Sequence, residues 1–265
     1  MDKEIRVVSK EDIKDVLNQL GIRKGMLLFV QSSLRPFGFV NGGAQAIIEA
    51  LMETVGYEGT IVMPAYTKGN SDPSALKIGT VPRDTWDKIR SSAIPFQKKI
   101  TAPQNMGEVA TQFMRNEAVL RSSHPTYSFL AWGKYAKLIV EKHALHFSLS
   151  KDSPLGKIVD LNGYVLMMGM NYDKCEMFHL AQYNAKKCPI KINAYPIEKG
   201  GSTAWIKMLD LELSNQGYQI IGSVMEERKI VAEAPLGDSY CRMFSSREAV
   251  NITTAYLNLE NDYDE

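Results

Sequence analysis

The sequence predicts an α/β protein with a mixed, largely parallel sheet that is flanked by helices. Apolar runs too short for helices alternate with segments of helical period, which is typical of this class. A strand, a helix and a second strand follow one another over 26–66, the pattern of a parallel crossover. The segment 67–127 carries little periodicity and recurrent prolines, so we expect an irregular, loop-rich stretch there.

The first half of the chain is expected to hold capped helices and buried strands. Ser9 and Asn41 are candidate N-caps, and Gly21 ends the first helix. Continuous apolar runs indicate strands that are buried on both faces. In chain order, the expected elements are a helix over 11–20, a strand over 26–33, a helix over 42–56, a strand over 60–66 and a helix over 108–117.

The second half continues the alternation and ends in a helix. Ser153 is a candidate cap, with Pro154 at the first helical position. We expect strands, some of them antiparallel, after about residue 190. The expected helices are 134–143, 154–161, 175–187 and 247–259, and the expected strands are 128–133, 164–170, 191–197, 202–209, 218–224 and 229–236.

Composition limits the classes of function. The chain of 265 residues carries 31 basic and 30 acidic side chains, so no global basic field favours nucleic acid or an anionic membrane. No apolar run approaches the roughly 20 residues that span a bilayer, and the first residues lack the apolar core of a secretory signal. With only three scattered cysteines, we expect a cytoplasmic protein. No linker divides the chain, so we expect one domain over 1–265.

A first candidate site is the turn after the strand at 26–33. Gln31, Ser32, Ser33 and Leu34 lead toward glycines that open the next helix. Backbone N–H groups and the positive end of a helix at such a place suit a pyrophosphate. Neither a dinucleotide fingerprint nor a P-loop is present, and a plain capped turn is the competing interpretation.

A second candidate site is the helix start after the strand at 164–170. His179 and Gln182 are three residues apart there and share one helix face. An imidazole can take a proton near neutral pH, as a general base for an ammonium substrate must. A structural histidine is the competing interpretation. The four histidines are scattered and no metal motif occurs, so we expect no metal.

Seven segments, in order, carry a resemblance to a known family. They are QSSLRPFGFVNGGAQAIIEAL, GTIVMPAYT, MGEVATQFMR, RSSHPTYSFLAWG, DSPLGKI, GYVLMMGMNYDKCEMFHLAQY and PLGDSYCRMFSSREAV. Together they span nearly the whole chain. The sequence resembles the aminoglycoside 3-N-acetyltransferase family, whose reaction moves an acetyl group from acetyl-CoA to a substrate amine.

The resemblance implies roles for individual residues. His179 matches the catalytic histidine, and Thr67 matches a threonine facing the pantetheine or the reaction centre. Thr67 is placed in the catalytic set because its hydroxyl is a candidate to stabilise the developing oxyanion. His124 matches a segment that lines the cleft. The residues implied for coenzyme A are Ser32, Ser33 and Leu34 at the pyrophosphate, with Phe39, Val40 and Gly42 nearby.

Two positions depart from the family pattern. The family usually has His where this chain has Gln31, and Glu where it has Gln182. Because Gln182 supplies no charge, His179 is expected to be a weaker base. Either Glu176 or Asp173 compensates, or the enzyme favours a substrate whose amine is already partly neutral. We nevertheless group Gln31 and Gln182 with the catalytic set.

A polycationic acceptor calls for an acidic cleft. Acidic residues in the predicted loops are candidates for it, although exposed acids are common on any surface. They are Asp72, Glu108, Asp152, Asp173 and Glu176.

The function expected from this resemblance is acetyl-CoA-dependent acetylation of an aminoglycoside 3-amino group, hence antibiotic resistance, with His179 as general base. The expected partners are coenzyme A and a small amine, and a homodimer stays open. Two alternatives remain: an acyl-CoA N-acyltransferase that acts on a non-antibiotic amine, or a weakened relative that only binds coenzyme A. A metal-dependent hydrolase has little support in the sequence.

Overall fold

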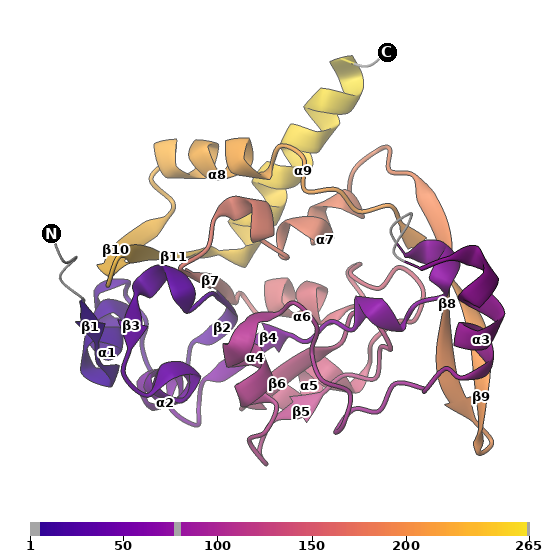
Figure 1. Ribbon diagram of the computed structural model, residues 1–265. Helices are drawn as coiled ribbons and strands as arrows, with labels where there is room; N and C mark the ends of the chain where they lie inside the picture. Colours follow the sequence, from indigo (N-terminus) through magenta and orange to yellow (C-terminus); the bar gives the residue numbers. More distant parts are fainter. Residues whose placement is uncertain (1–5, 77–80, 264–265) are drawn as a thin grey trace, which may run out of the picture.

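The structure, a computed structural model, describes residues 6–76 and 81–263, with side chains described through residue 259. A seven-stranded sheet lies at its centre, in the order β10-β11-β7-β2-β4-β6-β5 (Figure 1). The strands are β2 (Leu27–Ser32), β4 (Thr60–Pro64), β5 (Leu120–Arg121), β6 (Phe129–Gly133), β7 (Tyr164–Met168), β10 (Ala232–Leu236) and β11 (Ser239–Ser245).

The sheet is mixed and mostly antiparallel, which corrects the expectation of a largely parallel one. Only β2 pairs in parallel with its neighbours β4 and β7, as the crossover over 26–66 predicts. The four outer pairings, β10–β11, β11–β7, β4–β6 and β6–β5, are antiparallel. The parallel part is therefore confined to the centre, where three strands end at the same edge.

A tight hairpin accounts for one antiparallel edge. β10 and β11 are separated by only Gly237 and Asp238. Gly237 has a φ of 57°, and a Cβ there would lie 2.1 Å from the Phe37 carbonyl oxygen. Only glycine fits that position without a clash. The strand β11 was not expected from the sequence.

Helices cover both faces of the sheet. One face packs against α1 (Lys10–Gln19), α2 (Gly43–Val55) and α4 (Gly107–Phe113). The other packs against α5 (Ala136–Glu141), α6 (Pro154–Asp160), α7 (Phe178–Gln182), α8 (Tyr218–Glu227) and α9 (Ser246–Tyr263). Within β2, Leu28 and Val30 enter the first core while Leu27 and Phe29 enter the second, because alternate strand side chains face opposite ways.

Most of the expected elements are confirmed, with three differences. The segment 218–224 was expected to be a strand but is part of α8, where Tyr218, Ile221 and Met225 share one buried face at helical spacing. The helix expected over 175–187 is much shorter in α7. Asn41 does not cap α2, whose first residue follows Gly42 in a left-handed conformation with no side-chain cap.

The described residues of the segment 67–127, which are 67–76 and 81–127, are irregular, as expected, with short helices and one short strand. It holds α3 (Trp86–Ser91) and the 3-10 helices η2 (Lys68–Asn70), η3 (Pro73–Ala75) and η4 (Arg83–Thr85) before α4. Beside it stands a separate antiparallel hairpin, β8 (Ile190–Lys199) with β9 (Ser202–Leu211) (Figure 1). A third small sheet pairs β1 (Val7–Val8) with β3 (Phe39–Val40), and two further 3-10 turns are η1 (Arg35–Phe37) and η5 (Tyr172–Lys174).

Across 6–76 and 81–263, every helix is too short or too polar to span a bilayer.

Candidate active site

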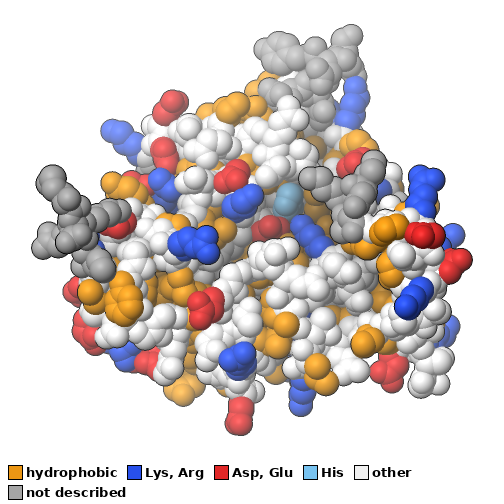
Figure 2. All heavy atoms as spheres, viewed as in Figure 1, with side chains coloured by type: hydrophobic (Ala, Val, Ile, Leu, Met, Phe, Trp, Pro, Cys, Tyr) orange, Lys and Arg blue, Asp and Glu red, His pale blue; other side chains and the backbone are white. Residues whose placement is uncertain are grey.

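A cavity of about 790 Å³ opens at the sheet edge where β2, β4 and β7 end. This is where open α/β sheets place their ligands. Figure 2 shows acidic and basic side chains mixed on this face, with one histidine visible in a hollow near α7. The polar and charged residues that line the cavity are Gln31, Ser32, Ser33, Arg35, Asn105, Asn171, Asp173, Lys174 and Glu176.

Gln31 fastens the end of β2 to the turn that precedes α7. Its amide nitrogen donates to the carbonyl of Lys174 at 2.7 Å, and its amide oxygen accepts from the backbone N–H of Glu176 at 3.0 Å. Both ends of the side chain are thus used. Gln31 therefore fixes the backbone of Glu176 relative to Ser32, its own neighbour in the chain.

His179 lies on α7, behind the cavity wall, and only 9% of the residue is exposed. Its Nδ1 is 2.8 Å from the hydroxyl of Tyr218 on α8 and 3.3 Å from the amide nitrogen of Gln182. Gln182 donates to the Ser214 carbonyl and, at 2.5 Å, to the Tyr218 hydroxyl. The Nδ1 side of the ring is therefore closed by a buried polar network.

The other ring nitrogen faces a carboxylate. Nε2 of His179 is 3.5 Å from Oε2 of Glu176, which has no hydrogen bond in the described part of the chain. The hydroxyl of Tyr66, two residues after the end of β4, is close enough that it and Glu176 shift each other's pKa. Through Glu176, the imidazole is one contact away from the cavity that Ser32 and Ser33 line.

Burial dominates the electrostatics of this pair. It lowers the pKa of His179 to about 3, with Lys68 and Lys191 adding to the effect. It also raises the pKa of Glu176, which Lys68, Tyr66 and Lys174 partly oppose. Each group is thus biased toward its neutral form. A cation entering the cavity next to Glu176 would favour the carboxylate.

The residues expected to hold coenzyme A divide into two groups. Ser32 and Ser33 line the cavity, together with Arg35, which the sequence analysis did not single out. Leu34 packs against the first core. Phe39 is 57% exposed, Val40 pairs with β1, and Gly42 precedes α2, all outside the cavity lining.

Thr67 is completely buried, and its hydroxyl donates to the carbonyl of Pro125 at 2.5 Å. Its backbone N–H donates to Thr126 at 2.7 Å. Both donors are therefore occupied by a neighbouring loop. In this arrangement Thr67 holds the chain after β4 and has no hydrogen left for an oxyanion.

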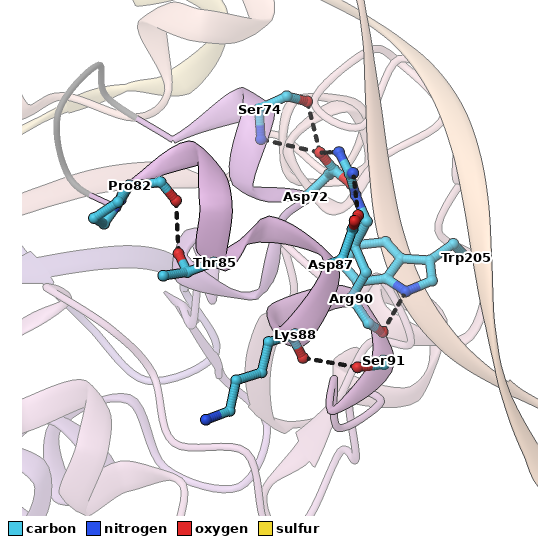
Figure 3. A network of polar contacts seen from close by, with 9 residues as sticks. All are labelled: Asp72, Ser74, Pro82, Thr85, Asp87, Lys88, Arg90, Ser91 and Trp205. Atoms are coloured by element: carbon cyan, nitrogen blue, oxygen red, sulfur yellow. Dashed lines mark hydrogen bonds and ion pairs between the residues drawn. The ribbon is translucent and has the colours of Figure 1, made fainter.

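The other expected acids lie in different surroundings. Asp72 forms an ion pair with Arg90 at 2.8 Å and accepts from Ser74, which holds the pKa of its carboxyl far below the usual value (Figure 3). Asp173 lines the cavity and pairs with Lys174 at 3.3 Å. Asp152 is exposed before α6, and the exposed Glu108 lies in the first turn of α4.

Both ring nitrogens of His124 form hydrogen bonds with the surrounding backbone. Its Nδ1 accepts from the N–H groups of Thr126 and Tyr127 at 3.2 and 3.0 Å, so Nε2 carries the hydrogen and donates to the Leu145 carbonyl at 3.2 Å. Burial lowers its pKa to about 4. The His124 ring holds the loop around it in place through these bonds, and His124 is not among the residues that line the cavity.

Besides Arg35, sequence reasoning missed Tyr218 and Tyr66 near the site. Tyr218 lies 39 positions after His179, on the segment mistaken for a strand, so no local spacing connects the two. Tyr66 ends an expected strand and gave no signal of its own. Within the described ranges, no group of three or more His, Cys, Asp or Glu is arranged to hold a metal ion.

Comparison with known proteins agrees with this fold and gives the family. Residues 29–258 match the family model described as aminoglycoside 3-N-acetyltransferase. The chain is 38% identical over 255 residues to the SPbeta prophage-derived aminoglycoside N(3')-acetyltransferase-like protein YokD of Bacillus subtilis, covering 96% of this chain and 93% of YokD. The crystal structure of YokD superposes with a TM-score of 0.93, at 37% identity, over 97% of this chain and 96% of that one.

Two further relatives extend the comparison. The chain is 32% identical to aminoglycoside N(3)-acetyltransferase III of Pseudomonas aeruginosa, covering 92% of this chain and 91% of that enzyme. The solved structure "AAC-IIIb binary with CoASH" shares the fold with a TM-score of 0.86, at 21% identity, over 96% of this chain and 98% of that one. With a family model matched over most of its length, this chain belongs to the aminoglycoside 3-N-acetyltransferase family and is an acyltransferase of that type.

Proposed function

We propose that the protein transfers the acetyl group of acetyl-CoA to an amine, and that the 3-amino group of an aminoglycoside is the first acceptor to test. The reaction is direct. The ammonium loses a proton to the His179–Glu176 pair, the amine attacks the thioester carbonyl, and the sulfur leaves as coenzyme A. No acyl-enzyme is required, because both substrates occupy the site together.

One observation carries the proposal: the ring of His179 meets a buried carboxylate that lines a cavity at the carboxyl ends of three parallel strands. Proton transfer by a positioned side chain contributes about 10²- to 10⁴-fold in rate. Hydrogen bonds at a site without substrate are often long and tighten in the complex, which suits the 3.5 Å between Nε2 and Oε2.

The part of the cavity lined by Ser32, Ser33 and Arg35 is suited to binding a thioester that carries phosphate groups. Ser32 and Ser33 offer hydroxyl groups, and Arg35 offers a guanidinium that can bind phosphate oxygens. Outside the cavity lining, Phe39 has an exposed ring and α2 begins without a side-chain cap. The solved relative with CoASH makes coenzyme A the natural ligand to test first.

Release of free thiol from acetyl-CoA tests this function. We expect thiol to appear only when an amine is added, with mass spectrometry showing one acetyl group on the amine. His179→Ala should lower the rate while calorimetry still detects binding of coenzyme A. Binding of acetyl-CoA without thiol release, over a panel of aminoglycosides and simple amines, would indicate a binding protein instead.

A second candidate acceptor is an amine with fewer charges than an aminoglycoside. Two of the expected acids are paired with basic residues, Asp72 with Arg90 and Asp173 with Lys174. The cavity lining also includes Arg35. This leaves less free negative charge than a polycation favours. If monoamines give the higher kcat/KM in the same panel, this candidate is preferred to the aminoglycoside.

A further inference from the structure

We infer that the carboxylate missing at position 182 has been replaced by Glu176, on the opposite side of the imidazole, and that Glu176 is the group that contacts the acceptor amine and takes its proton. This inference rests on the proposed acetyl transfer and assigns the proton acceptor within it. In this arrangement His179 stands behind Glu176 and positions it, and does not face the substrate directly.

The orientation of the Gln182 amide is fixed by its partners. Its oxygen accepts from the backbone N–H of Ser214 at 3.1 Å, so its nitrogen points toward Tyr218 and His179. An amide nitrogen has two hydrogens and accepts none. Both are used, by the Ser214 carbonyl and by the Tyr218 hydroxyl oxygen.

That orientation determines which nitrogen of His179 carries the hydrogen. Because the Tyr218 oxygen accepts from Gln182, its own hydrogen is free to be donated to Nδ1, 2.8 Å away. Nδ1 is therefore an acceptor, and the hydrogen of the neutral ring lies on Nε2, which faces Glu176. The ring has no free lone pair directed at the cavity.

Glu176, in contrast, has an oxygen with unused bonding capacity and lies in the cavity wall. Its Oε2 is buried without a hydrogen bond, and the residue lines the cavity. Gln31 holds its backbone in place, so the carboxylate does not depend on a mobile loop. A buried oxygen without a partner is costly unless a ligand completes it, and an ammonium group does so.

The proton and electron balance is simple. The Glu176 carboxylate takes one proton from the acceptor ammonium, and the neutral amine forms the C–N bond as the C–S bond breaks. The second proton of the nitrogen goes to the departing sulfur, which gives the free thiol. Glu176 then releases its proton to water, so the net products are the amide, coenzyme A and H⁺.

Several charged or titratable groups surround the pair and belong in any pH analysis. They come from the chain just after β4, from η2, η5 and the residue that follows η5, from α8 and β8, and from the loop before β6. They are Tyr66, Lys68, Tyr127, Lys174, Cys175, Tyr218 and Lys191.

The test compares Glu176→Gln with the double variant Glu176→Gln/Gln182→Glu, which moves the carboxylate to the family position. We expect kcat/KM to fall by about 10²-fold or more in the single variant, with loss of the acidic limb of its pH profile, and to recover at least about tenfold in the double variant. The matched control is Glu227→Gln, an exposed glutamate on α8, which should keep the wild-type rate. A wild-type rate and pH profile in Glu176→Gln, or no recovery in the double variant, overturns the inference.

A second measurement needs no turnover. Nitrogen NMR of the His179 ring should show a protonated Nε2 and a bare Nδ1, and Glu176→Gln should move the Nε2 resonance. A protonated Nδ1, or an Nε2 resonance that ignores residue 176, overturns the assignment. If the wild-type protein acetylates no amine at all, the proposed function fails, and the ring measurement still decides where the hydrogen lies.

Discussion

His124 and His179 differ in what their ring nitrogens contact, although both are buried and both have a lowered pKa. Every bonding group of His124 is used by the backbone of the loops it joins. His179 is bonded on one side only, and its other nitrogen faces a carboxylate that lines a cavity. Burial and a lowered pKa are common to both rings, so the contact with a cavity-lining carboxylate is what distinguishes His179 from His124.

The largest effect should come from His179→Ala. It removes the ring that positions Glu176, so we expect kcat/KM to fall by about 10²- to 10⁴-fold. Steady-state thiol release measures this change, and calorimetry checks that the variant still binds coenzyme A. An activity within a few-fold of the wild type would mean that His179, like His124, has only a structural role.

Acid should destabilise the fold through the buried histidines. The folded-state pKa of His124 is about 4 against an ordinary 6.5, so its contribution is fully present above about pH 6.5 and is lost as the pH falls toward 4. A shift of this size corresponds to on the order of 3 kcal/mol. His143 and His179, with pKa values lowered to about 3, act in the same direction over a wider range. Urea unfolding measured between pH 7.5 and 4 checks this; a flat profile contradicts it.

His124→Ala should affect stability and leave the chemistry alone. It leaves the N–H groups of Thr126 and Tyr127 and the carbonyl of Leu145 without their partner, which costs about 1–3 kcal/mol. Denaturant midpoints measure the loss. The activity per folded molecule should match the wild type, and a specific loss of kcat would place His124 in the site after all.

The smallest effect should come from Tyr218→Phe. It removes the donor to Nδ1, but Gln182 lies 3.3 Å from the same nitrogen and can donate in its place. One neutral hydrogen bond is worth about 0.5–1.5 kcal/mol, so we expect a decrease of about 2- to 12-fold in kcat/KM. If the loss equals that of His179→Ala, Tyr218 takes part in the proton transfer itself.

The parts of the fold that sequence predicts best are those with local causes. The apolar runs that became β2, β4 and β7 are recognisable because both faces of these central strands are buried. Ser153 and Pro154 likewise begin α6 as expected. The direction of a strand has no such local cause. No sequence pattern within β6 or β11 indicates that these strands run antiparallel to their neighbours β4 and β7.

The position of the candidate site could be predicted from the sequence, but the hydrogen-bond partners of its side chains could not. Gln31 and Gln182 stood out because they depart from the family pattern, and Glu176 was named as a compensating acid. The side of the imidazole that each residue occupies depends on how α7, α8 and the end of β2 pack together. Tyr218 enters through that packing alone, from a segment whose Tyr and Ile residues resemble a strand.

The two-ended bond of Gln31 has a consequence for how the substrates influence each other. Gln31 adjoins Ser32, which lines the cavity, and it grips the backbone on either side of Cys175. A ligand that shifts the end of β2 would therefore also shift Glu176, the proposed proton acceptor. On that proposal, binding of the acetyl donor would change the basicity that the acceptor amine meets, through one uncharged side chain.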